Sequence, residues 1–284
     1  MCVREDLQSK YDMLKSILAQ TGGVLVAYSG GVDSTLLLRV AMEALGDRAL
    51  AVTASSETYP MHEVDEAVCL AHEMGARLRT IHTEELDMEE FASNPPERCF
   101  YCKQELFGKL IAIAEQEGLP AVADGSNVDD EGDFRPGTKA AAQLGVRHPL
   151  REAGLTKADI RELSRELGLP TWDKPSFACL ASRFPYGDSI TREGLKRVAA
   201  AEQVLRDLGF RQLRVRHHGE TARIEVGVQD LSKAVAPAER DRIVSEFRKL
   251  GYLYVTLDLE GYRTGSMNRV LTPDVIGGES SARA

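Results

Sequence analysis

A glycine-rich loop between a buried strand and a helix constrains the fold more than any other feature of the sequence. The apolar run Val24–Tyr28 has the length and the β-branched residues of a buried strand, and a helical pattern follows from about Ser34 to Leu45. Between them stands Ser29-Gly30-Gly31-Val32-Asp33-Ser34. A strand, a tight turn and a helix in this order begin a unit of two parallel strands joined by a crossover helix.

The same alternation continues through the first half of the chain. Further strand patterns, each after a helical pattern, occur at Ala49–Thr53, Leu78–His82 and Ala121–Ala123. The helical pattern before the last of them runs from about Lys103 to Glu117. Strands that alternate with helices predict an α/β fold, a parallel sheet with helices on both faces. Such sheets bind ligands at the carboxyl ends of their strands. Because Ser29, Thr53 and Asp124 stand at three of these ends, we expect them to lie close together.

The pattern changes after Gly168-Leu169-Pro170, where a helix ends. A long helical pattern over 191–208 then precedes two short strand patterns around His218-Gly219-Glu220, which is typical of a hairpin turn, and a last helix and strand follow. We therefore predict two domains, an α/β domain over residues 1–170 and a smaller α+β domain over residues 171–284.

Charge and hydropathy limit the possible partners. The chain of 284 residues has 35 Lys and Arg and 44 Asp and Glu, a net charge of −9. Since attraction to polyanions grows with basic charge, we expect no nucleic-acid partner, although a local basic pocket can still bind a small anion. No apolar run approaches the roughly 18 residues of a membrane span, and the charged first twenty residues do not resemble a secretion signal. We expect a cytoplasmic protein with no membrane partner.

The glycine loop has the composition of a phosphate site. Gly30 and Gly31 allow the backbone to approach a ligand closely, and the following helix offers unpaired N–H groups and the positive end of its dipole. Hydroxyl donors come from Ser29, Ser34 and Thr35, while Asp33 is suited to capping the helix or holding Mg²⁺. The loop lacks the Gly-Lys-Ser/Thr of a Walker A motif. A tight turn that needs glycine for structural reasons alone is the alternative.

These residues resemble the SGGxDS pyrophosphate loop of the PP-loop ATP pyrophosphatases. Members of that group cleave ATP between its α and β phosphates, adenylate a carbonyl or carboxyl oxygen, and let a nitrogen or sulfur nucleophile displace AMP. The resemblance implies that ATP and Mg²⁺ bind along the loop, that the adenine lies near Thr53 and Ala54, and that Asp33 takes part in catalysis.

Three of the five cysteines favour a metal site. Cys99 and Cys102 form a C-x-x-C pair, and thiolates at this spacing can share one metal or one cluster. Together with Cys179, in a loop-like segment, they can bind three irons of a 4Fe–4S cluster and leave one iron open for a hydrosulfide. A redox pair at 99 and 102 with a packed thiol at 179 is the alternative, and the absence of a second C-x-x-C disfavours zinc. We interpret Cys69 as a core residue.

A second resemblance, over nearly the whole chain, is to the LarE family. It is carried by four segments, Asp124–Asp130, Arg135–Thr138, Lys174–Arg183 and Gly261–Asn268. That family activates a carboxylate of pyridinium-3,5-biscarboxylic acid mononucleotide with ATP and installs sulfur, which yields the organic part of a nickel-pincer cofactor. In one branch the cysteine matching Cys179 gives up its sulfur and becomes dehydroalanine, whereas another branch uses three cysteines and an iron–sulfur cluster. Cys99 and Cys102 make this chain resemble the second branch.

Arginines are the main candidates for substrate binding. Arg214 and Arg216 alternate on a predicted strand, so both guanidinium groups lie on one face, and their forks suit phosphate and carboxylate. The LarE resemblance implies that the substrate phosphate binds near them and near Ser182 and Arg183. A solvated strand face paired with acids is the alternative.

Several acids are open to two interpretations. Asp129 and its neighbours Asp124 and Asp130 are suited to orienting the substrate or holding Mg²⁺, or to an Asx-rich turn. Glu202 and Glu225 resemble family acids near the anion pocket, but solvent-exposed acids on a helix and a strand explain them equally well.

The prediction is an ATP-dependent sulfur transferase with a PP-loop domain over residues 1–170 and a substrate and sulfur-transfer domain over residues 171–284. Its expected partners are a small-molecule substrate and sulfide or a sulfur-carrier protein. We also expect a homo-oligomer, although no sequence feature argues for a number of subunits. The rivals are a tRNA thiolase or ammonia-using synthetase of the same fold, and a nucleotide-binding iron–sulfur or zinc regulatory module without turnover.

Overall fold

The structure is a computed structural model that describes residues 5–130, 136–175, 178–263 and 266–271. Residues 135, 176, 177, 264 and 265, which belong to segments that resemble LarE, lie outside the described residues. The chain divides into two compact units, Met1–Phe177 and Ala178–Ala284.

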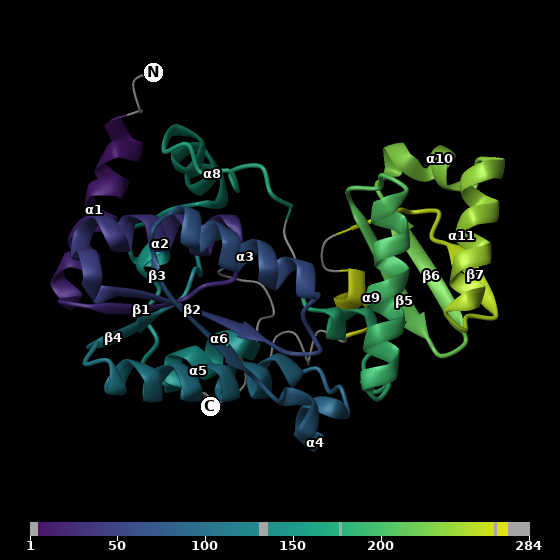
Figure 1. The fold of residues 1–284 in the computed structure, drawn as a ribbon, viewed down its shortest axis with the longest axis horizontal. Coiled ribbons are helices and arrows are strands. Elements are labelled where there is room, and N and C mark those ends of the chain that lie inside the picture. The colour runs from purple at the N-terminus through teal and green to yellow at the C-terminus, as the bar shows by residue number, and fades with distance from the viewer. Residues whose placement is uncertain (1–4, 131–135, 176–177, 264–265, 272–284) are drawn as a thin grey trace, which may run out of the picture. The chain divides into compact units, whose positions relative to one another are not determined.

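The first unit is built on a parallel four-stranded sheet (Figure 1). Its strands β1 (Val24–Ala27), β2 (Ala49–Ser55), β3 (Arg77–His82) and β4 (Ala121–Ala123) lie in the order β3-β2-β1-β4, and all neighbouring pairs are parallel. The helices of this unit are α1 (Glu5–Thr21), α2 (Val32–Leu45), α3 (Met61–Glu73), α4 (Glu89–Ala92), α5 (Arg98–Gln116), α6 (Pro136–Gln143), α7 (Pro149–Glu152) and α8 (Lys157–Glu166). The predicted α/β fold is confirmed.

Strand alternation divides the core of this unit into two layers. Val24 and Val26 of β1 pack with residues of α1, α2 and α8, whereas Leu25 between them packs on the other face with residues of α5. Both faces of β1 are therefore buried, as the continuous apolar run predicts. Because all four strands are parallel, the ends of β1, β2 and β4, with Ser29, Thr53 and Asp124, lie at one edge of the sheet.

The second unit contains a three-stranded mixed sheet (Figure 1). Strands β5 (Leu213–His218) and β6 (Thr221–Val226) form the predicted hairpin, and β7 (Tyr254–Leu257) pairs with β6 in parallel. The helices are α9 (Arg192–Asp207), α10 (Leu231–Val235) and α11 (Pro237–Lys249). Residues of α9, α11 and the strands form its own apolar core, which includes Leu205, Val215 and Phe247.

Two local expectations are corrected. Helix α5 begins at Arg98 rather than near Lys103, so Cys99 and Cys102 lie inside its first turns. Cys69 is exposed, not part of the core, because the buried side of α3 carries Ala67 and Ala71 and position 69 faces away from both.

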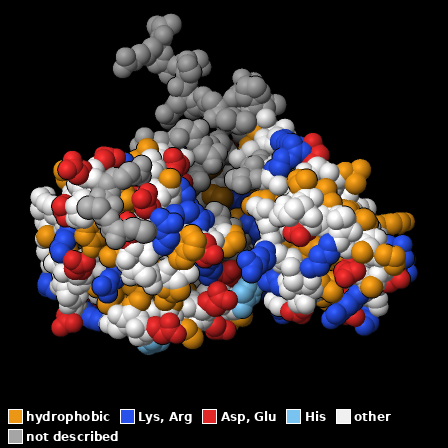
Figure 2. Space-filling model, turned by 90° about the horizontal axis from the view of Figure 1, so that it is seen from above, with side chains coloured by type: hydrophobic (Ala, Val, Ile, Leu, Met, Phe, Trp, Pro, Cys, Tyr) orange, Lys and Arg blue, Asp and Glu red, His pale blue; other side chains and the backbone are white. Residues whose placement is uncertain are grey.

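The surface carries charges of both signs. On the face drawn in Figure 2, Lys and Arg side chains are interspersed with Asp and Glu side chains. No helix within the described ranges is long and apolar enough to cross a membrane.

Candidate active site

The loop after β1 is held by its own hydroxyl groups. The Ser29 and Ser34 hydroxyls lie 3.1 Å apart, the Ser29 N–H donates to Ser34 Oγ at 3.2 Å, and the Ser34 hydroxyl donates to the Gly31 carbonyl at 3.3 Å. Gly31 is the N-cap of α2, without any side-chain cap. The first N–H groups of α2 therefore lack an intrahelical acceptor, which is the arrangement that binds phosphate.

Glycine allows close packing at two positions around this loop. Gly30 has a φ of +68°, and a Cβ there would lie 2.6 Å from the Cβ of Ala67 on α3. A Cβ on Gly125, after β4, would lie 3.0 Å from the Cβ of Asp33 and 3.1 Å from the Ser34 nitrogen. The segments after β1 and β4 are thus in close contact, as expected for the carboxyl edge of a parallel sheet.

Asp33 binds cationic and amide groups instead of capping its helix. Its Oδ2 accepts a hydrogen bond from the ammonium of Lys157, at the start of α8, and its Oδ1 accepts from the Asn127 amide at 3.2 Å. The carboxylate is therefore directed at a cation. A carboxylate oxygen of this kind is a suitable ligand for Mg²⁺. A metal ion would compete with the Lys157 ammonium for Asp33 Oδ2.

An aspartate–histidine pair, with His148 buried and Asp124 half-buried, stands at the end of β4. Asp124 Oδ1 lies 2.7 Å from His148 Nδ1 and also accepts from the Ser126 N–H at 3.0 Å. Burial is the largest influence and raises the pKa of Asp124, but the hydrogen bond from His148, the charge of Lys103 and the hydrogen bond from the Ser126 N–H together outweigh burial, so the pKa lies below its usual value. Asp124 therefore stays ionised beside the loop.

The other predicted nucleotide residues lie on β2 and α2. Thr53 is buried and its hydroxyl donates to the Tyr28 carbonyl at 3.0 Å, which ties β2 to the end of β1. Ala54 is half-buried and Thr35 is fully buried on α2.

Asp129 has the contacts of a turn and helix-start residue. Its Oδ2 accepts from the Lys157 N–H at 2.5 Å, and its own N–H donates to Asn127 Oδ1 at 3.0 Å. Asp130 Oδ2 accepts from the Asn127 N–H at 2.9 Å. These contacts match the Asx-rich turn, and they fix Lys157 beside Asp33.

Cys99 and Cys102 stand three positions apart on α5, so they lie on one face of the helix, and both are half-buried. Cys179 belongs to the second unit and is also half-buried. Among the residues that the structure describes, no group of three or more His, Cys, Asp and Glu side chains is gathered as metal ligands. Two thiolates on one helix face supply only part of the donor set that a cluster needs.

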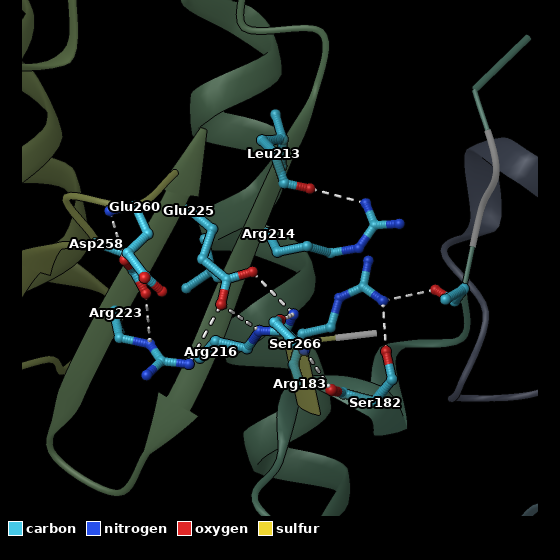
Figure 3. A network of polar contacts seen from close by, with 12 residues as sticks. Ser182, Arg183, Leu213, Arg214, Arg216, Arg223, Glu225, Asp258, Glu260 and Ser266 are labelled. Carbon is cyan, nitrogen blue, oxygen red and sulfur yellow. Dashed lines mark hydrogen bonds and ion pairs between the residues drawn. The ribbon is translucent and has the colours of Figure 1, made fainter. Parts of the chain in front are cut away.

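The second unit contains two buried arginine–glutamate pairs, of which Figure 3 labels both members of the pair Arg216–Glu225. Arg183 Nε and Nη2 donate to the two carboxylate oxygens of Glu202 at 2.8 and 3.1 Å. Arg216 Nε and Nη2 donate to those of Glu225 at 2.9 and 2.8 Å. Glu202 and Glu225 are 0% and 1% exposed, so their interpretation as solvent-exposed acids is wrong.

Arg214 lies in the same cluster, where the positive charge of Arg183 repels its guanidinium. Its Nη1 donates to the Leu213 carbonyl at 2.7 Å and its guanidinium lies 5.1 Å from the centre of the Tyr262 ring. Burial, followed by repulsion from Arg183, lowers the pKa of Arg214. A bound anion would relieve that repulsion, so the cluster is suited to phosphate or carboxylate.

The remaining contacts join this cluster to the segment that carries Cys179. Arg183 Nη1 donates to the carbonyls of Ala178 and Cys179 at 2.7 and 3.0 Å, and Arg216 Nη1 donates to the Ser182 carbonyl at 2.8 Å (Figure 3). Arg216 Nη2 also donates to Ser266 Oγ at 2.8 Å.

Sequence reasoning missed three residues of the first unit, Lys157, His148 and Asn127. Thr156 and Asp159 form a capping box at the start of α8, so the place of Lys157 at a helix start was open to prediction. Its contact with Asp33, 124 positions away, has no local signal.

Comparisons with known proteins agree with this architecture. The family model described as NAD synthase matches residues 7–98. A protein of Synechocystis sp. described as uncharacterized is 44% identical over 94% of this chain and 99% of its own length. The pyridinium-3,5-bisthiocarboxylic acid mononucleotide synthase of Lactiplantibacillus plantarum is 41% identical over 94% of this chain and 96% of its own. A tRNA-specific 2-thiouridylase of Azorhizobium caulinodans is 29% identical over 60% of this chain and 53% of its own.

Identity above 40% across nearly both whole chains is far more extensive than the partial match to the thiouridylase. The glycine loop at the start of α2 fits the same group of proteins. The chain therefore belongs to the LarE family of the PP-loop ATP pyrophosphatases, whose members are ATP-using, sulfur-transferring enzymes.

Proposed function

We propose that this enzyme converts the carboxylates of pyridinium-3,5-biscarboxylic acid mononucleotide to thiocarboxylates at the expense of ATP. The observation that carries the proposal is the 41% identity, over nearly the whole of both chains, with a synthase named for the bisthiocarboxylic product. The PP-loop unit would adenylate the substrate, and the C-terminal unit would bind its phosphate and transfer sulfur.

Adenylation is the first step of the proposed reaction. ATP binds with its phosphates on the loop at the start of α2, where Ser29, Gly30, Gly31 and Ser34 surround the helix end, and with its adenine near Thr53 and Ala54. Asp33 is the proposed Mg²⁺ ligand. A substrate carboxylate oxygen attacks the α phosphorus, the bond to the β-phosphate oxygen breaks, and pyrophosphate leaves. Fixed donors aimed at the phosphates supply most of the rate.

Sulfur transfer is the second step. A sulfur nucleophile attacks the acyl carbon, a carbon–sulfur bond forms, and AMP leaves. We propose Cys99, Cys102 and Cys179 as cluster ligands; when bound, the cluster would supply an open iron that takes up hydrosulfide. In the competing route the Cys179 sulfur attacks, and loss of the residue's α proton then breaks its Cβ–S bond and leaves dehydroalanine.

Substrate binding is assigned to the arginine cluster. Arg214 and Arg216 are the proposed ligands of the substrate phosphate, supported by the repulsion that lowers the pKa of Arg214. Sulfide or a carrier protein is the proposed sulfur source. We propose a homo-oligomer, which sedimentation of the purified protein tests.

The experiment is incubation of anaerobically purified protein with ATP, Mg²⁺ and the pyridinium mononucleotide, followed by measurement of AMP, pyrophosphate and thiocarboxylate. The proposal expects all three, and Cys179→Ala should abolish thiocarboxylate while AMP still forms. Cys69→Ala is the matched control, because Cys69 is exposed on α3. Failure to form AMP, or AMP formation that depends on tRNA or ammonia instead, contradicts the proposal.

The same samples distinguish the sulfur routes. A cluster predicts about four irons per chain and an unchanged mass of Cys179 after turnover. Loss of H₂S from Cys179 in iron-free protein identifies the sacrificial route instead.

A further inference from the structure

We infer that Arg183, supported by Glu202, is a positioning residue that fixes the backbone of Cys179, and that it is not a ligand of the substrate phosphate. The inference rests on the proposed role of Cys179 in sulfur transfer and adds to it the residues that hold this cysteine in place.

The donors of Arg183 are used within the protein. Its side chain is 0% exposed, and an arginine has five N–H donors in a planar fork. One edge of the fork binds both carboxylate oxygens of Glu202. The Nη1 group binds three acceptors, the carbonyls of Ala178 and Cys179 and the hydroxyl of Ser182 at 2.8 Å. A guanidinium committed in this way and without exposed surface cannot meet a substrate phosphate unless these bonds break, whereas the Arg216 side chain is 10% exposed.

The Cys179 carbonyl is the point on which these donors converge. It accepts from Arg183 Nη1 at 3.0 Å, from the Ser182 hydroxyl at 2.8 Å and from the Ser182 N–H at 3.0 Å. Cys179 is also the N-cap of the 3₁₀ turn Leu180–Arg183. Because three donors fix the carbonyl of Cys179 and Arg183 fixes that of Ala178, the direction in which the Cys179 side chain leaves the backbone is set.

Glu202 fixes the arginine in turn. Its Oε1 also accepts from the Val215 N–H of β5 at 3.1 Å, and its Oε2 from Arg206 Nη2 at 3.3 Å. The Cys179 segment is thereby joined through Arg183 and Glu202 to α9 and to the strand that carries Arg214. Since a buried ion pair adds little net stability over apolar side chains, its geometric role is the stronger reason for its presence here.

A positioning role can be separated from a structural one by the coupling of the two reaction steps. In Arg183→Lys, which keeps the charge but loses the fork, we expect the ratio of AMP to thiocarboxylate at saturating substrate to rise roughly 10–100-fold, because displacement of a reacting group by about 1 Å has an effect of this size. A merely structural role would lower both products together and leave their ratio unchanged. Arg206→Lys is the matched control, because Arg206 donates to the same carboxylate, whereas it is Arg183 that donates to the carbonyls of residues 178 and 179.

A second readout needs no turnover. Alkylation of full-length protein by iodoacetamide, followed by mass spectrometry, gives the rate at Cys179 relative to the exposed Cys69. We expect this relative rate to rise in Arg183→Lys and not in Arg206→Lys. An unchanged relative rate together with an unchanged product ratio overturns the inference. A loss of the proposed function would instead appear as wild-type protein that forms no thiocarboxylate, or as Cys179→Ala that still does.

A folding failure of Arg183→Lys would not leave the question open. Ser182→Ala removes one donor to the Cys179 carbonyl and one of the acceptors of Arg183, but the ion pair of Arg183 with Glu202 remains, so the variant should fold. It should raise the alkylation rate of Cys179 and the product ratio in the same direction, by a smaller factor. No change in either quantity would again contradict the role of these donors.

Discussion

Replacement of Gly30 by alanine tests the phosphate loop most directly. Gly30 has a φ of +68°, a conformation that costs an L-residue about 1–2 kcal/mol. Its new Cβ would lie 2.6 Å from the Cβ of Ala67, far inside the optimal carbon–carbon distance of about 3.5–4.0 Å. Relief of such an overlap typically costs about 1–3 kcal/mol. We therefore expect Gly30→Ala to lower the free energy of unfolding by about 2–5 kcal/mol.

Gly22 offers a matched control. Its φ of +66° is nearly the same, but a Cβ there would have nothing within 4 Å. Gly22→Ala should therefore lower the free energy of unfolding only by the conformational cost of about 1–2 kcal/mol. It should leave AMP formation unchanged. The difference between the two variants isolates the contact between Gly30 and α3. Adding Ala67→Gly to Gly30→Ala should recover part of the lost free energy of unfolding. The recovery should be incomplete, because the Cα of residue 67 would still lie 2.9 Å from the new Cβ.

Urea unfolding of the two variants, with AMP formation under conditions where both are folded, measures these effects. Movement of Gly30 away from α3 would displace the N–H groups that follow it, so AMP formation should fall in Gly30→Ala and remain in Gly22→Ala. Equal stability losses in the two variants would refute the steric reasoning. Wild-type AMP formation by folded Gly30→Ala would show that the loop does not bind the phosphates.

The remaining predictions concern Lys157, Arg214 and His217. Lys157→Met removes the ammonium that binds Asp33, so half-maximal AMP formation should need roughly 2–5-fold less Mg²⁺. A higher Mg²⁺ concentration at half-maximal AMP formation would contradict competition between Lys157 and Mg²⁺ for Asp33. Arg214→Ala should raise the KM for the pyridinium mononucleotide roughly 10–100-fold without changing that for ATP, with the exposed Arg211→Ala as control; the reverse pattern would remove the anion site from the cluster. Burial, followed by repulsion from Arg197, lowers the pKa of His217. The neutral His217 side chain therefore contributes fully to the free energy of unfolding above about pH 6.5, and this contribution is lost as the pH falls through the lowered pKa of the folded protein. Between pH 7 and pH 5, urea unfolding should show a smaller decrease in the free energy of unfolding for His217→Gln than for wild type. An equal decrease would be evidence against the titration of His217.

The fold of the first unit was predictable because its signals are local. A continuous apolar run, a glycine turn and a helical pattern stand next to one another at Val24–Leu45, and β1, the loop and α2 form there. The start of α5 was placed too late because its first residues, Arg98 and Cys99, do not belong to an apolar stripe.

The acids of the second unit were harder to interpret because their partners are distant in sequence. Glu202 pairs with Arg183, 19 positions earlier. A signal was nevertheless present, since Glu202 stands on the same stripe of α9 as the buried Leu195, Val198 and Leu205. An acid on an apolar stripe predicts a buried partner, although it does not identify which arginine provides it.

The hydrogen-bond donors of Arg183 and Ser182 that hold the Cys179 segment bind main-chain oxygens and not the sulfur of Cys179. Whatever becomes of that sulfur atom, the hydrogen bonds that hold the segment are spared. In the sacrificial route, fresh and used protein should therefore unfold at nearly the same temperature, although their masses differ by the lost H₂S.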